Sequence, residues 1–132
     1  ANKLEDYEEG TWTPSVGGNA TYHNQSGKYV KIGNVVHVGA VIQPNSLGTG
    51  STTTVSGFPF ATSNAGGGYA TGDVGFHYLL ATNVLDVKLL MGNGVTETGF
   101  QTKTSASQHS SSAQAIFGDG ARVDFFITYY TA

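Results

Sequence analysis

The chain has no cysteine among its 132 residues, so disulfides, thiol catalysis and cysteine-bound zinc are excluded. Charged residues make up only 11% of the sequence, too few for the solvated surface of an all-helical protein. The formal net charge of −3 gives no basic footprint for nucleic acid. No apolar run reaches the roughly 18 residues of a membrane helix, so membrane insertion is not expected. What is present is glycine, at 19 positions, which favours β structure with many turns.

The two ends of the sequence suggest how the chain is organised. It begins Ala1-Asn2-Lys3 and its only methionine is Met91, so we expect a piece of a longer protein. Residues 1–9 hold a short acidic cluster, which predicts a solvated lead-in or a single helical turn continuing from an upstream domain. From Gly10 onward the pattern changes to β, which predicts one domain over residues 10–132.

The clearest hairpin signal is Gly33-Asn34, which joins the alternating segments 28–32 and 35–42. The second of these segments is apolar on both faces, and both faces of 122–130 carry aromatic residues. Such strands are either central in a sandwich or covered by a neighbouring subunit. The candidate subunit-interface residues are Val35, His37, Val41, Phe126 and Tyr130.

The remaining pattern consists of short strands separated by turns. Further strands are predicted over 10–16, 20–23, 51–56, 69–81, 84–91 and 95–103, with turns at 17–19, 25–27, 92–94 and 118–120 and loops at 63–68 and 105–112. Phe58 and Phe60 bracket Pro59 and predict a hydrophobic plug. About eight to ten strands with frequent turns predict an antiparallel β-sandwich or jelly roll.

Residues with catalytic or metal-binding chemistry form no motif. The four histidines are far apart in sequence, so no metal and no other cofactor is expected, although three copies of His37 on a three-fold axis remain an oligomeric exception. A glycosidase needs two facing carboxylates. The candidates are Asp73, Asp86, Glu97, Asp119 and Asp124, and each also fits a turn or a polar strand position. No residue is assigned a catalytic role.

Sugar binding needs aromatic rings beside amide and hydroxyl groups rather than charge. The aromatic residues in Asn-, Thr- and Ser-rich surroundings are the glycan-binding candidates Trp12, Tyr22, Tyr69 and Tyr78. For Trp12, the only tryptophan, packing in the core or an interface is the plainer interpretation.

Three motifs in a fixed order resemble a known family. They are LEDYEEGTWTP at 4–14, GKYVKIGNVV at 27–36 after Thr21-Tyr22, and GFPF at 57–60. Together they resemble the C-terminal domains of bacteriophage tail fibre and tailspike proteins, in which Leu is usual at the position of Phe58. The motifs cover roughly residues 4–60, and their order makes chance agreement improbable.

The resemblance implies a homotrimeric tip domain at the distal end of a fibre or spike in the virion, with a fold like a jelly roll or a carbohydrate-binding module. It implies roles in trimerisation and in recognition of the host surface, with cell-surface polysaccharide or lipopolysaccharide as the partner class. Any polysaccharide-degrading activity would belong to an upstream region, and no catalytic residue carries over. The alternatives that stay open are a polysaccharide-degrading enzyme domain and a monomeric carbohydrate-binding module.

Overall fold

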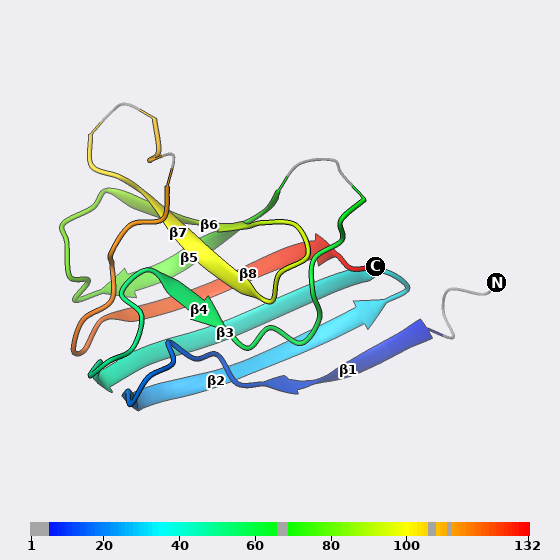
Figure 1. The fold of residues 1–132 in the computed structure, drawn as a ribbon, viewed down its shortest axis with the longest axis horizontal. Helices are drawn as coiled ribbons and strands as arrows, with labels where there is room; N and C mark the ends of the chain where they lie inside the picture. Colours follow the sequence, from blue (N-terminus) through cyan, green and yellow to red (C-terminus); the bar gives the residue numbers. More distant parts are fainter. Residues whose placement is uncertain (1–5, 66–68, 106–107, 111) are drawn as a thin grey trace.

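Eight antiparallel strands form one curled sheet in a computed structural model that describes residues 6–65, 69–105, 108–110 and 112–132. The strand order is β1-β2-β3-β8-β5-β6-β7-β4 (Figure 1). The strands are β1 Tyr7–Trp12, β2 Thr21–Ile32, β3 Val35–Ser46, β4 Thr54–Ser56, β5 Ala70–Tyr78, β6 Asp86–Met91, β7 Glu97–Lys103 and β8 Arg122–Tyr130. The all-β, antiparallel prediction is confirmed. All eight strands belong to a single sheet. Likeness to a jelly roll or to a carbohydrate-binding module stays a prediction.

The two edges of this sheet approach each other. Ser15, which follows β1, forms an isolated bridge with Ser56 at the end of β4. The two backbones exchange hydrogen bonds of 3.1 and 2.8 Å, with each N–H donating to the other residue's carbonyl. The sheet therefore wraps around one core and has a buried inner face and an outer face.

The predicted hairpin at Gly33-Asn34 is confirmed. Ile32 pairs with Val35 across a two-residue loop, and Gly33 has a φ of 61°. A positive φ at the first loop residue alone is the pattern of a type II′ turn, whose twist suits an antiparallel pair. Glycine at this position avoids the steric cost that a side chain would meet.

The predicted turn at residues 25–27 is wrong, because β2 runs unbroken for 12 residues. Its partner β3 continues past the predicted stop at Pro44 as far as Ser46, and it supplies backbone partners to the polar part of β2. Register shifts lie at Tyr22, opposite Pro44, where proline has no N–H to donate.

Other strand boundaries also differ from the predicted ones. Strand β1 begins at Tyr7 and pairs with the end of β2, so the last three residues of the expected lead-in belong to the sheet, whereas 1–5 lie outside the described residues. Of the predicted strand 51–56 only Thr54–Ser56 is extended. The predicted loops 63–68 and 105–112 include residues 66–68, 106–107 and 111, which also lie outside that part of the chain.

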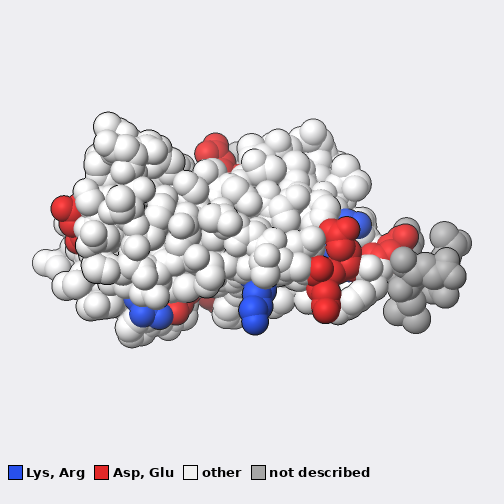
Figure 2. All heavy atoms as spheres, turned by 90° about the horizontal axis from the view of Figure 1, so that it is seen from below, with Lys and Arg blue, Asp and Glu red and all other residues white. Residues whose placement is uncertain are grey.

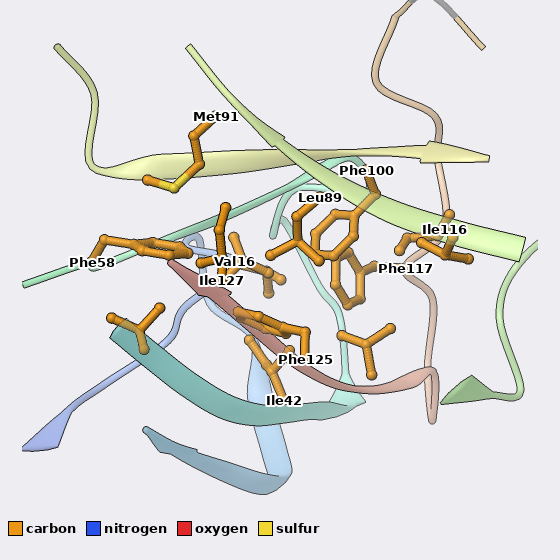
Figure 3. Packing of buried hydrophobic residues seen from close by; sticks show 14 of the residues in the cluster. Val16, Ile42, Phe58, Leu89, Met91, Phe100, Ile116, Phe117, Phe125 and Ile127 are labelled. Carbon is orange, nitrogen blue, oxygen red and sulfur yellow. The ribbon is translucent and has the colours of Figure 1, made fainter. Parts of the chain in front are cut away.

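The core lies between the two sides of the curled sheet. Figure 1 shows β7 and β4 crossing over β3 and β8, and Figure 3 shows the side chains between them. Phe100 of β7 lies 6.1 Å from Phe125 of β8 and 5.4 Å from Phe117, measured between ring centroids. Phe58 is 4% exposed and packs on Trp12 at 4.6 Å, so the predicted plug is confirmed. These contacts join loops and strands into one core.

Candidate functional site

An apolar region on the outer face of β2, β3 and β8 is the first candidate site. Strand register places residues of the three strands side by side on this face. We call this region the outer patch and define it as Ile32, Val35, His37, Val41, Phe126 and Tyr130. Phe126 is 51% exposed, Tyr130 65% and Ile32 45%. The five residues predicted for a subunit interface therefore lie on one face, and a single chain covers only the inner face of β3 and β8.

His37 is tied to its neighbours within the outer patch. Its Nδ1 is 2.6 Å from the hydroxyl oxygen of Thr128, and its ring centroid lies 6.1 Å from that of Phe126. One ring nitrogen is thus engaged in a hydrogen bond. Within residues 6–65, 69–105, 108–110 and 112–132, no group of three or more metal-ligating side chains comes together. Metal binding by three copies of His37 stays a prediction.

Sequence reasoning missed Phe76, which extends this face on β5 beside the glycan-binding candidate Tyr78. Phe76 and Tyr78 are 51% and 45% exposed, with ring centroids 6.0 Å apart. The Arg122 guanidinium lies 5.4 Å from the Phe76 centroid and is paired with Asp124 at 2.7 Å, which raises the pKa of Arg122. A bulge between Val74 and Phe76 reverses the inside–outside alternation. Sequence periodicity alone carries no signal for that reversal.

The four glycan-binding candidates do not share one site. Trp12 is 7% exposed and its ring packs on Phe58 and Phe125, so the plainer interpretation of core packing is confirmed and the ring is not an open sugar platform. The Tyr22 hydroxyl lies 3.3 Å from the Ser15 hydroxyl and accepts from the Val16 N–H, which makes it a structural contact.

The two other candidates are open to solvent but distant along one strand. Tyr69, which precedes β5, is 62% exposed, and Tyr78, at the other end of β5, is 45% exposed. A sugar ring stacking on either of them would not reach the other. Their role in glycan binding stays a prediction.

Four of the five candidate carboxylates have internal partners. Asp124 pairs with Arg122, Asp73 accepts from Lys88, and the Asp119 carboxylate accepts from the Leu47 N–H. Asp73 and Asp86 share the Lys88 ammonium, so these two carboxylates lie close together, each held in an ion pair.

Asp86 has the most elaborate surroundings of the four. It lies 3.2 Å from His109 Nε2 and 3.6 Å from Lys88 Nζ. Burial opposes ionisation, but the Lys88 charge, the Val87 N–H and His109 outweigh it and lower the pKa of Asp86. A general acid needs a raised pKa, so these surroundings do not suit Asp86 to that role.

Little charge is present on the surface as a whole. Figure 2, seen from the side on which β1 and β2 lie in Figure 1, shows mostly uncharged residues with acidic groups gathered toward one end. No helix that is long and apolar enough to cross a membrane occurs in the described part of the chain.

Comparisons of the chain with protein-family models, with curated proteins and with solved structures found no match.

Proposed function

We propose that this chain is the non-enzymatic tip domain of a homotrimeric phage tail fibre or tailspike. In this account it stabilises the trimer at the distal end of the virion's fibre and contacts host-surface glycan. The observation that carries the proposal is the outer patch, where Phe126 and Tyr130 are exposed on the same face of the sheet as Ile32, Val35 and Val41.

The chemistry of the outer patch suits association with other copies of the chain. Contiguous exposed apolar surface marks interaction sites, and interface centres are enriched in aromatic residues and depleted of charge. Phe126 and Tyr130 are exposed aromatic residues, and Val35 and Ile32 lie in the same cross-strand row as Tyr130. Covering this surface with a neighbouring subunit would remove their apolar area from water.

The motif resemblance supports the trimeric order and the viral context. The residues of the three motifs form β1, the β2–β3 hairpin and the Phe58 plug. These elements include the β2 and β3 residues of the outer patch. The resemblance is therefore carried by residues that determine this part of the fold.

The test is a double variant, Phe126→Lys with Tyr130→Lys. Both side chains are exposed in the single chain, so the variant should fold, but two desolvated ammonium groups would prevent association. We expect sedimentation to show a trimer for the wild type and a monomer for the variant.

Leu85→Lys is the matched control, because Leu85 is 69% exposed and precedes β6, outside the outer patch. It should remain trimeric. A double variant that folds and keeps the wild-type mass would remove the outer patch from the interface.

A further inference from the structure

A polar row crosses β5, β6 and β7 on the outer face, on the side of the sheet away from β1. Asp73 pairs with Lys88, and Lys88 pairs with Gln101, so the three side chains lie in adjacent positions. The neighbouring positions Val87, Leu89 and Phe100 point into the core. Alternation along the strands therefore places the row on the outer face, where polar side chains are usually exposed to water.

Gln101 departs from that expectation, because it is only 9% exposed. Two residues between β7 and Ile116 bond to the β7 backbone: Ser110 N–H donates to Thr102 O and Gln114 N–H donates to Phe100 O, both at 2.9 Å. Gly99 permits the close approach, since a Cβ there would lie 2.9 Å from the Ala113 Cβ. His109 lines the same cleft as Gln101, so described residues that follow β7 lie beside the Gln101 side chain.

The Gln101 side chain has a hydrogen-bonding capacity that the fold does not use. Its Oε1 is buried and accepts no hydrogen bond from the portion of the chain that the structure describes. Gln43, equally buried at 7%, accepts from Asn24 Nδ2 at 2.7 Å and donates to Gly120 O at 3.1 Å. An orphaned buried acceptor costs about 1–3 kcal/mol, so a donor from outside the described residues, either a ligand hydroxyl or a water, is favoured at this position.

Gln101 lines a cleft of about 360 Å³ that is open to solvent. Other residues that line this cleft include Thr71, Asp73, Lys88, Leu90 and His109. The volume lies at the small end of the ligand-pocket range of roughly 300–1,000 Å³, which suits one sugar unit.

The charges at the cleft select the kind of ligand. Two carboxylates, Asp73 and Asp86, contact the single Lys88 ammonium, so an anionic ligand is disfavoured. Carboxylate, hydroxyl, amide and ammonium groups together match a neutral molecule that carries several hydroxyls, and Leu90 offers an apolar contact for its carbon face.

We propose that this cleft binds one neutral sugar unit, with a sugar hydroxyl donating to Gln101 Oε1 and further hydroxyls contacting Asp73 and Lys88. The inference deepens the glycan recognition of the proposed function and rests on it for the source of the sugar. It places the site on β5, β6 and β7, where the lining residue Thr71 lies two positions after the sequence-predicted candidate Tyr69.

The experiment titrates the isotope-labelled chain with D-glucose, D-galactose, L-rhamnose and N-acetyl-D-glucosamine, with D-glucuronate as the charged probe, and follows backbone amide shifts. We expect at least one neutral sugar to shift the amides of Lys88, Gln101 and His109, and glucuronate to bind more weakly. Shifts confined to other surfaces, or none with any neutral sugar, would overturn the proposal and leave Gln101 with bound water only.

Two matched variants separate binding from folding. Gln101→Met removes an acceptor that has no partner, so it should weaken sugar binding about tenfold or more without lowering the unfolding temperature. Gln43→Met breaks two satisfied hydrogen bonds and should lower the unfolding temperature while keeping sugar binding. A Gln101→Met variant that binds sugar as the wild type does would also overturn the proposal.

The mass of the same samples separates the two proposals. A trimer without sugar binding contradicts only the cleft, whereas a monomer that binds sugar contradicts only the trimeric tip.

Discussion

At the scale of single residues, Tyr129 shows how burial changes chemistry in this fold. Its side chain is 2% exposed and its hydroxyl donates to the Phe60 carbonyl at 2.7 Å, fixing the segment after the Phe58 plug against β8. Burial raises the pKa of the Tyr129 phenol from 10.0 to about 12. Tyr129 therefore stays neutral in the folded chain at pH values where an exposed tyrosine ionises.

This pKa difference predicts a loss of stability in alkali. Between pH 10 and about 12 the unfolded chain releases the Tyr129 proton and the folded chain retains it, so the free energy of unfolding falls as the pH rises. The full difference is about 3 kcal/mol. Tyr129→Phe should cost about 1 kcal/mol at neutral pH and flatten the alkaline slope in denaturant titrations.

The control for that experiment is Tyr130→Phe, whose ring is 65% exposed. Tyr7 and Tyr29, which donate to Glu9 and Glu8, remain in both variants and contribute equally. A Tyr129→Phe variant with the wild-type slope would contradict the assignment.

Sequence reasoning at this scale succeeded where alternation was strict. The buried residues Val123, Phe125, Ile127 and Tyr129 of β8 follow the predicted face. For Trp12 the sequence left core packing and a sugar platform both open, because whether an aromatic ring is open to solvent depends on which distant rings pack on it. Nothing in the sequence indicates that Gln101 is buried, since a glutamine at a polar strand position is usually exposed.

At the scale of elements, the β2–β3 hairpin was predictable and the length of its strands was not. Gly33-Asn34 has a local signature, because the turn itself demands a positive φ. The continuity of β2 through residues 25–27 depends on β3 continuing past Pro44, and the outward direction of Phe76 depends on a bulge in β5. Both are set by partner strands far away in the sequence.

The hairpin predicts a specific cost for one substitution. Gly33→Ala places a side chain at a φ of 61° and should lower the free energy of unfolding by about 1–2 kcal/mol in urea titrations. Gly75→Ala is the matched control, because a Cβ there meets nothing within 4 Å, and its effect should be smaller. Equal costs for the two variants would contradict the turn assignment.

At the scale of the whole molecule, strand order is the feature that composition and periodicity left open. Strand β8 lies between β3 and β5, and the Ser15–Ser56 bridge brings the edges together. These pairings join segments widely separated in sequence, and no local pattern specifies them. The same arrangement places Val35, Phe126 and Tyr130 on one outer face. The apolar residues that the sequence predicts on both faces of these strands therefore form a surface that another subunit can cover.

The most direct test of this account is the mass of the wild-type chain in solution by light scattering during size-exclusion chromatography. The account predicts three times 13.7 kDa, unchanged on dilution, because the outer patch is buried between subunits. A mass of 13.7 kDa across the same dilution series would contradict it.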